Sequence, residues 1–599
     1  MDQREKTRLL ARAQSHVIQI RDRIGQKVKE ITESAQQIRQ KLSKLSPQDQ
    51  LVHARVLQNQ GKRELELGAL YPSPYFIKCE IVFEGETDPR IFYFSKFSFS
   101  EEHVYSWTSP AAVIRFENPG NVSYVVPEFG SKGGTLLSKD QYMITNGKIR
   151  YMATESLGSP RQLVYQEYFS DRKEGFLLRE IVEQMEKAQD KVIRAPVQGS
   201  FLITGPAGSG KTTLALHRVA YLLQSPDTAA RFMDTESIVF VQDASTKMYF
   251  GKLLPQLGVA NVRIVTFEEW AREQLSLQGV RFAFRYGETE LERDQYEFAK
   301  NRVLKEAPIP SYYSDIFLLL ETLYTEYLSF HVLPLFSRQR KDRILDRFDL
   351  TILLRSFAGT RKGFNTYETE YTQLRGGKVK RTKVSVPLVY SLMILDEVQN
   401  FLPEQVALLK MCIDSQNHSI MYVGDLAQQT RLCTIRDWKE VGERLAEDQV
   451  AVLQKNYRST QQILEYIRRQ GYTVEIPQGL KQGPEVEEIG VVGSDEVVNL
   501  INKVLGKDGT LTIGVLAITH EQINGIKKEY IDKHNVHVLT VHEAQGVEFD
   551  VVFLLSGRGN YVEPLAEPAF EAERSRVARD LTYVALTRAV RELYIIEQK

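Results

Sequence analysis

The chain has 599 residues, of which 42% are hydrophobic and 26% charged, and its 77 Lys and Arg residues balance 77 Asp and Glu residues. This length predicts several domains, because one hydrophobic core rarely serves more than about 300 residues. No apolar run reaches the roughly 18 residues of a membrane span, and a net charge of zero argues against a protein that coats nucleic acid by bulk charge. The cysteines form no metal-ligand pattern, so we expect reduced core thiols in a cytoplasmic protein at Cys79, Cys412 and Cys433.

Residues 1–70 are predicted to form a helical arm. Apolar residues recur at every seventh position, at Leu10, Val17, Ile24, Ile31, Ile38 and Leu45. This spacing predicts a coiled-coil-like helix over 2–45, and Ser46 and Pro47 suit the cap and first turn of a second helix that ends near residue 67. Because the second helix is too short to cover the whole stripe, the stripe must pack on the chain's own body, on a second copy or on a partner.

Residues 71–172 are predicted to form a small β-rich module. The stretches FIKCEIVF, RIFYFSKFSFS and YMITNGKIRYM are rich in β-branched and aromatic residues. Asn146 and Gly147 suit a tight hairpin turn between two strands. The aromatic run at 91–99 fits the core of a sheet, and a base-stacking surface is the alternative interpretation.

From about residue 200 onward, short apolar strands alternate with helical stretches, which predicts an α/β fold with parallel sheets. The first α/β domain is expected in two parts, 173–270 and 386–449. A helical insertion over 271–385 separates them, and its basic loop KVKRTK at 378–383 either touches phosphates or is solvated. The second α/β domain is expected over 450–599.

The sequence GPAGSGKTT at 205–213 fits the pattern G-x-x-x-x-G-K-[ST] and follows a predicted strand. Glycines in such a loop let backbone N–H groups close around phosphate oxygens at a helix N-terminus. Lys211 is expected to pair with the β- and γ-phosphates of ATP, and the Thr212 hydroxyl is expected to bind Mg²⁺. The predicted phosphate-binding set is Gly205, Pro206, Ala207, Gly208, Ser209, Gly210, Lys211, Thr212 and Thr213.

Two further strands end in polar residues. LMILDEVQN at 392–400 ends an apolar strand with two carboxylates. We expect Asp396 to hold Mg²⁺ and Glu397 to orient and deprotonate the attacking water. In VGDLAQQ, Gln428 follows another strand and is the candidate that reaches the γ-phosphate or the water.

Candidate groups for closing over the nucleotide lie later in the chain. In QKNYRST, Tyr457 could stack on adenine and Arg458 could bind the γ-phosphate, because a guanidinium fork suits phosphate oxygens. Arg588, in YVALTRAVREL, is a second candidate arginine finger. An isolated arginine on a helix is more often only solvated.

Taken in chain order, the motifs EKAQDKVI, GPAGSGKT, VTFEEW, ILDEVQNF, GDLAQQ, NYRS, TVHEAQGVEFDVV and YVALTRA resemble the motif series of superfamily 1 helicases of the UvrD/Rep type. The resemblance implies two RecA-like P-loop domains that bind ATP and Mg²⁺ between them, preceded here by the helical arm and the β-rich module. It implies that Gln189 reads the adenine edge and that Glu548 contacts the ribose. It also implies that Arg458 and Arg588 reach the γ-phosphate from the second domain.

A narrower resemblance is to the HelD group, ATPases that remove RNA polymerase from stalled complexes. It rests on SPYF at 73–76, SWTSPAAVIRF at 106–116, ALHRVAYLL at 215–223 and LLPQLGVANVRIVTFEEW at 253–270. It implies an ATP-driven motor whose N-terminal arm contacts RNA polymerase or another protein partner, with DNA as a further partner and no membrane.

Three departures bear on that reading. Ser106 and Thr108 stand where HelD relatives carry Asp and Arg. In TRLCTIRDW, after GDLAQQ, no aromatic precedes the final Trp438, so the nearby Tyr or Trp that UvrD-type motors stack on bases is lacking. Only about 80 residues separate NYRS from TVHEAQG. The last two features favour the HelD-like function over the alternative, a DNA helicase or translocase in repair or phage defence. An ATP-gated switch that binds nucleic acid without moving is a third hypothesis.

Overall fold

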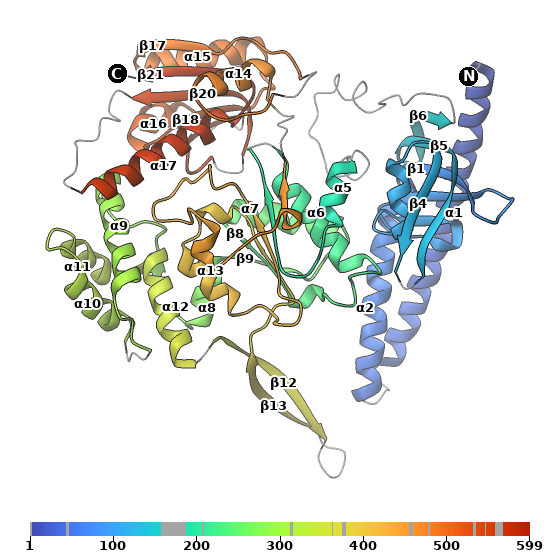
Figure 1. Cartoon of the computed structure of the whole chain (residues 1–599), viewed down its shortest axis with the longest axis horizontal. Coiled ribbons are helices and arrows are strands. Elements are labelled where there is room, and N and C mark those ends of the chain that lie inside the picture. Colours follow the sequence, from blue (N-terminus) through green and yellow to red (C-terminus); the bar gives the residue numbers. More distant parts are fainter. Residues whose placement is uncertain are drawn as a thin grey trace. The chain divides into compact units, whose positions relative to one another are not determined.

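The computed structural model describes residues 3–42, 47–127, 129–156, 187–206, 209–311, 315–361, 363–373, 379–453, 459–476, 480–530, 533, 535–544, 547–557 and 567–598. The chain divides into two compact units (Figure 1). Unit 1 comprises Met1–Ala195, Leu216–Asp234 and Gly251–Asn261, and unit 2 comprises Pro196–Ala215, Thr235–Phe250 and Val262–Lys599. Over these described ranges, no helix has the length and apolar character needed to cross a membrane.

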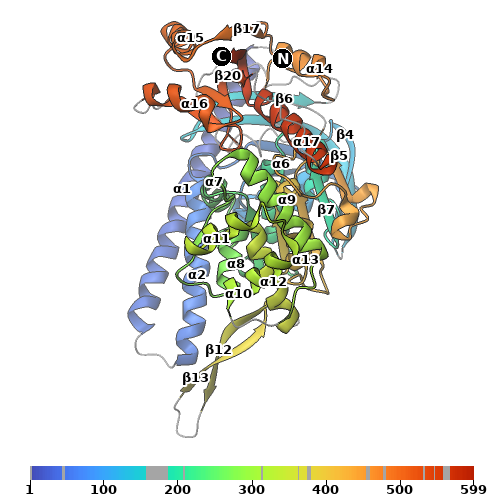
Figure 2. The same ribbon diagram turned by 90° about the vertical axis from the view of Figure 1, so that its left-hand side faces the viewer.

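Unit 1 begins with two helices that pack against each other, α1 (Gln3–Leu42) and α2 (Pro47–Leu70). Pro47 is the first residue of α2, as its fixed φ angle predicts. Ser46 and Leu45 lie outside the described residues. The two helices run side by side in both views (Figure 2), and α1 has 40 residues against the 24 of α2.

The β-rich module follows as one sheet. Its described strands are β1 (Ile77–Phe83), β2 (Arg90–Ser95), β3 (Val104–Ser106), β4 (Gly120–Val126), β5 (Gly130–Thr145) and β6 (Lys148–Ser156). Their order is β3-β2-β1-β5-β4, with β6 paired to β5, and β2 and β3 are the parallel pair. Asn146 and Gly147 join β5 to β6 with φ angles of 49° and 76°, which confirms the predicted hairpin turn.

The apolar stripe of α1 packs on this sheet. Val17, Ile20 and Ile24 are at most 1% exposed and belong to one core with aromatic side chains of the module. The Gln14 side chain adds two hydrogen bonds to the hairpin turn, from Nε2 to the Gly147 oxygen (2.8 Å) and from the Ile149 N–H to Oε1 (2.9 Å). The middle of the stripe therefore covers the chain's own body, while Leu10 is 39% exposed.

Unit 2 contains the first parallel sheet. Its strands in the described residues are β7 (Ser200–Thr204), β8 (Ser237–Val241), β9 (Arg263–Thr266), β14 (Leu392–Leu395), β15 (Ser419–Val423) and β16 (Val450–Val452). They lie in the order β16-β7-β15-β14-β8-β9, and every pair is parallel. The α/β architecture is thus confirmed. β16 belongs to this sheet although its residues follow the boundary predicted at 450.

The insertion combines helices with a hairpin. Its helices are α9 (Glu290–Glu306), α10 (Ile316–Tyr327), α11 (Leu333–Lys341) and α12 (Arg347–Arg361). Two antiparallel strands follow, β12 (Asn365–Gln373) and β13 (Val379–Pro387). The basic segment expected as a loop is therefore mainly strand, because β-branched Val and Thr residues are interspersed among its cations and suit a pleated ribbon.

The second α/β domain has a parallel sheet of its own in the order β17-β21-β20-β18-β19. The strands are β17 (Glu487–Val492), β18 (Ile513–Ala517), β19 (Val536–Thr540), β20 (Phe549–Gly557) and β21 (Ala589–Gln598), and the helices are α14 (Gln461–Arg469), α15 (Ser494–Lys507), α16 (His520–Lys527) and α17 (Pro568–Leu586). Helix α17 contacts the first domain, because Asp580 accepts from the Gln429 N–H (3.1 Å) and Glu573 accepts from the Cys433 N–H (2.8 Å).

Candidate nucleotide site

The phosphate loop joins β7 to α6 (Lys211–Gln224) in the place that the motif predicts. Gly205 and Gly210 have φ angles of 149° and 84°, which residues with a Cβ atom rarely adopt. A Cβ atom on Gly205 would lie 2.2 Å from the Leu453 carbonyl oxygen, so only glycine fits there. Ser209 and Thr213 are buried beside the loop, and Ala207 and Gly208 lie outside the described residues.

Lys211 is held inside the loop. Its Nζ donates to the carbonyl oxygens of Gly205 (2.8 Å) and Pro206 (3.0 Å). Burial lowers the pKa of this ammonium group, and the charge of Glu397 opposes the shift. A terminal phosphate would supply the strong negative partner that neutral carbonyls do not, which suits the role expected of this lysine.

Thr212 and Asp396 lie together, as the predicted Mg²⁺ site requires. The Thr212 hydroxyl donates to Asp396 Oδ1 (3.1 Å). Asp396 directly follows β14, and its N–H still donates to the Phe240 oxygen of β8 (2.9 Å). Burial, followed by the nearby charge of Glu397, raises the pKa of Asp396. A hydroxyl and a carboxylate are hard oxygen donors of the kind that Mg²⁺ prefers, so these residues fit the ion.

Glu397 occupies a strained turn. Its φ and ψ angles of 49° and 44° are left-handed, which costs a non-glycine residue about 1 kcal/mol and is concentrated at functional sites. Gln399 fixes the side chain, since its Nε2 donates to Glu397 Oε2 (2.5 Å). The other end of the Gln399 amide accepts from the Asp425 N–H (3.1 Å). The left-handed turn thus sets the direction of the Glu397 carboxylate, and the Gln399 amide holds it in place.

Gln428 lies against the phosphate loop. Its buried side chain donates to Asp425 Oδ2 (2.6 Å) and to the Gly205 oxygen (3.3 Å). Asp425 and Gln399 are members of the site that the sequence reasoning missed. Asp425 directly follows β15 and its glycine, as Asp396 follows β14, and the ends of neighbouring parallel strands meet at one edge of a sheet.

The candidate arginine finger Arg588 lies after α17 and is 7% exposed. It donates from Nε to the Val584 oxygen (3.1 Å) and from Nη1 to the Val547 oxygen (3.3 Å). Its positive charge lowers the pKa of Lys211, after burial and the opposing charges of Glu397 and Asp425. Glu548 is half-buried just before β20. Tyr457 and Arg458 lie outside the described residues.

Gln189 is in unit 1, half-buried on α5 (Lys187–Ile193). Its neighbour Asp190 accepts from Arg194 Nε (2.9 Å) and faces Arg115 of the β-rich module at 3.5 Å. Arg194 also donates to the Trp107 oxygen (2.8 Å), so ion pairs and hydrogen bonds join this short helix to the module.

The missing Asp–Arg pair of the SWTSP segment has a neutral replacement. Ser106 Oγ and Thr108 Oγ1 lie 2.9 Å apart, within hydrogen-bond distance of each other. Thr108 and the intervening Trp107 are both 2% exposed. A pair of hydroxyls thus takes the place where the HelD resemblance leads us to expect a pair of charges, at a lower desolvation cost.

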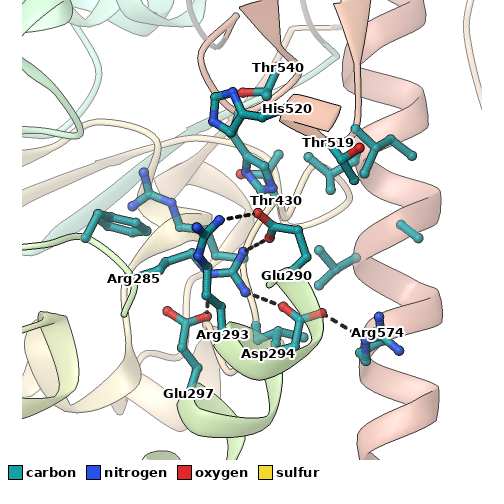
Figure 3. Close-up of a pocket in the computed structure, with 18 of the residues that line it drawn as sticks. Arg285, Glu290, Arg293, Asp294, Glu297, Thr430, Thr519, His520, Thr540 and Arg574 are labelled. Atoms are coloured by element: carbon teal, nitrogen blue, oxygen red, sulfur yellow. Dashed lines mark hydrogen bonds and ion pairs between the residues drawn. The ribbon is translucent and has the colours of Figure 1, made fainter. Parts of the chain in front are cut away.

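Unit 2 also contains a cavity of about 690 Å³ between α9, the 430–432 segment, the 518–520 and 540–543 segments, and α17 (Figure 3). Arg285 contacts Glu290 (2.7 Å), Asp294 and Glu297 (3.2 Å), and Arg574 donates to Asp294 (2.8 Å). Cationic side chains that could meet a phosphodiester chain are therefore paired here with carboxylates of α9.

Arginine charges act on a histidine of this cavity. Burial and then the charges of Arg285, Arg431 and Arg347 lower the pKa of His542 to about 3, so this ring is neutral at physiological pH. Arg431 lies over the Phe284 ring at 3.9 Å, in the segment where UvrD-type motors would place a stacking aromatic.

Comparison with known proteins gives two family matches. The model described as an AAA domain matches residues 188–434, and the model described as a UvrD-like helicase C-terminal domain matches residues 497–599. The ATP-dependent DNA helicase PcrA of Bacillus subtilis (strain 168) is 35% identical over 79 residues, which are 13% of this chain and 11% of that protein. The chain thus spans about a tenth of that curated relative.

A solved structure, the C-terminal domain of a possible DNA helicase from Lactobacillus plantarum WCFS1, is 20% identical to this chain. The match covers 24% of this chain and 88% of that chain, with a TM-score of 0.18. A score this low supports no assignment.

Proposed function

We propose that the chain is a HelD-like motor of the UvrD/Rep superfamily 1 helicases, which are ATP-hydrolysing enzymes. The match to the AAA domain, the match to the UvrD-like helicase C-terminal domain and the likeness to PcrA support that superfamily. In this proposal the chain hydrolyses ATP to remodel or release RNA polymerase from nucleic acid in the cytoplasm. The observation that carries the proposal is unit 1, in which a helical arm docks on a β-rich module ahead of the motor. The sequence leaves only about 80 residues between NYRS and TVHEAQG in the second α/β domain, where UvrD-type motors insert a large extra domain.

The geometry supports hydrolysis by residues of the phosphate loop after β7 and of the turn after β14. Lys211 exchanges its two loop carbonyls for phosphate oxygens when ATP binds. Mg²⁺, when bound by Thr212 and Asp396, supplies charge neutralisation of the triphosphate. Glu397, aimed by its left-handed turn and held by Gln399, accepts the proton of the attacking water.

Closure of the two domains would complete this set. In the proposal Arg458 and Arg588 reach the γ-phosphate from the second domain, with Tyr457 on the adenine, Gln189 at its edge and Glu548 at the ribose. Arg588 now bonds two backbone carbonyls, so closure would exchange those acceptors for phosphate oxygens. Hydrolysis would therefore require closure of the cleft between the two α/β domains.

The arm offers a surface for a protein partner. Val52 and Val56 lie one turn apart on α2 and are 58% and 38% exposed. Two apolar side chains on one helical face, next to the basic last turn of α1 with Arg39 and Lys41, suit a mixed apolar and charged contact.

A release assay tests the proposal. Stalled transcription complexes, built from the source organism's RNA polymerase on an immobilised template, are incubated with the chain and ATP. We expect polymerase in the supernatant with the wild type, none with Lys211→Ala, and less with Val52→Asp/Val56→Asp at unchanged basal ATPase. Polymerase that stays bound in the presence of active wild-type ATPase would overturn the polymerase role.

A second candidate function is a DNA helicase or translocase. The likeness of a 79-residue stretch of this chain to the ATP-dependent DNA helicase PcrA favours it. It predicts processive unwinding over hundreds of base pairs by the isolated chain, whereas the first proposal predicts poor unwinding of long blunt duplexes. A helicase assay on a long labelled duplex separates the two.

A further inference from the structure

The hairpin β12–β13 projects from the body of unit 2 (Figures 1 and 2). Its two strands pair in register from Asn365 with Pro387 onward, and in the part of the chain that the structure describes they form a sheet of their own. The base is anchored, since the Leu388 N–H donates to the Phe364 oxygen (2.8 Å) and the buried Phe364 ring meets the edge of Trp270 at 4.9 Å. The hairpin is thus anchored at its base, and side chains on both of its faces are exposed.

One face of this ribbon carries cations and an aromatic ring. Directly opposed residues in an antiparallel pair share a face, and so do residues two apart along a strand. Tyr367 lies opposite Ser385, and Thr369 lies opposite Lys383, with Arg381 two positions further along. Tyr367 is 69% exposed, and Arg381 and Lys383 are also exposed.

The other face carries the acidic residues. Glu368 lies opposite Val384, and Glu370 lies opposite Thr382. Lys380, two positions before Thr382, shares this face with the two carboxylates. Strand alternation therefore separates the charges of a hairpin whose overall composition is mixed.

We propose that the face formed by Tyr367, Arg381 and Lys383 binds single-stranded nucleic acid. Two cations spaced along one strand can each meet a phosphate, and an exposed tyrosine on the same face can stack on a base. An acidic protein surface would satisfy the cations but not the exposed ring. Binding here requires neither ATP nor RNA polymerase, so the proposal goes beyond the polymerase function and is tested separately from it.

The test is fluorescence anisotropy without nucleotide, using a labelled oligothymidine of about 20 nucleotides at several KCl concentrations. Lys380→Ala is the matched control, because it removes one cation from the same strand on the opposite face. We expect Arg381→Ala/Lys383→Ala to weaken binding about tenfold and to reduce the salt slope by about 1.4, that is, two phosphate contacts. Lys380→Ala should stay within about twofold of the wild type.

Tyrosine variants test the stacking. Tyr367→Ala should weaken binding about fivefold or more, and Tyr367→Phe should restore it, because the ring and not the hydroxyl stacks. A matching duplex should respond less to Tyr367→Ala than the single strand does. Basal ATPase equal to the wild type shows that each variant is folded.

Three outcomes would overturn the proposal. They are wild-type affinity in Arg381→Ala/Lys383→Ala, equal losses in that variant and in Lys380→Ala, and a wild-type chain that fails to bind the single strand at low salt. Release of polymerase by the wild type is unaffected by these results, so the two proposals can fail independently.

Discussion

The nucleotide site and the interface between α1 and the β-rich module are both buried, but they are stabilised differently. At the nucleotide site Lys211, Asp396 and Gln428 are buried ionic or polar groups. Their hydrogen bonds go to the phosphate loop, to Thr212 and to Asp425. At the arm interface Val17 and Ile24 are buried apolar groups that pack on aromatic rings. Substitutions at the first region should therefore remove chemistry while leaving the fold, and substitutions at the second should do the reverse.

The largest expected effect is on Arg588. Losing an arginine finger costs about 10³–10⁵ in turnover in related phosphoryl-transfer enzymes. We expect Arg588→Ala to reduce the ATPase rate by a factor in that range, with nucleotide affinity much less affected. Arg588→Lys should rescue little, because an ammonium lacks the planar fork. A fall of less than about threefold in a chain with normal thermal stability would place Arg588 outside the site.

Glu397 tests whether a substitution at the nucleotide site removes the chemistry and leaves the fold. Removing a general base typically costs about 10²–10⁴ in rate. Glu397→Gln keeps the size of the side chain and an oxygen that can accept from Gln399, so the turn and the fold should persist. We expect turnover to fall by that factor, measured by phosphate release, while ATP binding stays near the wild type. The exposed Glu447 provides a control, and Glu447→Gln should hydrolyse normally. Wild-type hydrolysis by Glu397→Gln would make the assignment wrong.

The arm interface should behave in the opposite way. Ile24 is 1% exposed, so Ile24→Asp buries an unpaired carboxylate and should destabilise unit 1 by about 3–5 kcal/mol. Ile18 on the same helix is 50% exposed, and Ile18→Asp should cost less than about 1 kcal/mol. Thermal unfolding of both variants checks this, with ATP turnover per folded molecule as the second readout. Equal stability of the two variants would contradict the docked arm.

The two regions also differ in how far the sequence alone predicts them. Phosphate chemistry prescribes residue types and spacing, so Lys211, Thr212 and Asp396 could be predicted and do come together. Gln399 and Asp425 could not, because their roles depend on a side chain of one strand end reaching the backbone of the next.

For the arm, periodicity shows that one face is buried but not which surface covers it. The prediction therefore stayed open between the chain's own body, a second copy and a partner, and packing on the β-rich module settled it for Val17 and Ile24. The hairpin differs from the predicted loop for a related reason. The cations of KVKRTK are typical of a solvated loop, but the β-branched Val and Thr residues among them make residues 379–387 a strand.

The smallest effect concerns Asp580, a charged group at a structural contact rather than at the reacting atoms. Burial raises its pKa to about 6, although Arg576 and the Gln429 N–H act in the opposite direction. The folded chain thus holds this proton more tightly than the unfolded chain, whose aspartate has a pKa of about 3.9. The stability that protonated Asp580 contributes is complete below about pH 4 and is lost as the pH rises through about 6.

Asp580→Asn keeps an oxygen acceptor for the Gln429 N–H and removes the titration. The variant should therefore gain stability relative to the wild type between about pH 4 and pH 6 and keep a constant advantage above about pH 7. Because the carboxyl is only partly buried, solvent screening should limit the gain to about 1 kcal/mol. Melting temperatures of the wild type, Asp580→Asn and the exposed control Asp448→Asn across this range measure it. A difference that shrinks with rising pH would show that Arg576 outweighs burial, so that this contact between the two α/β domains depends on the ionised carboxylate.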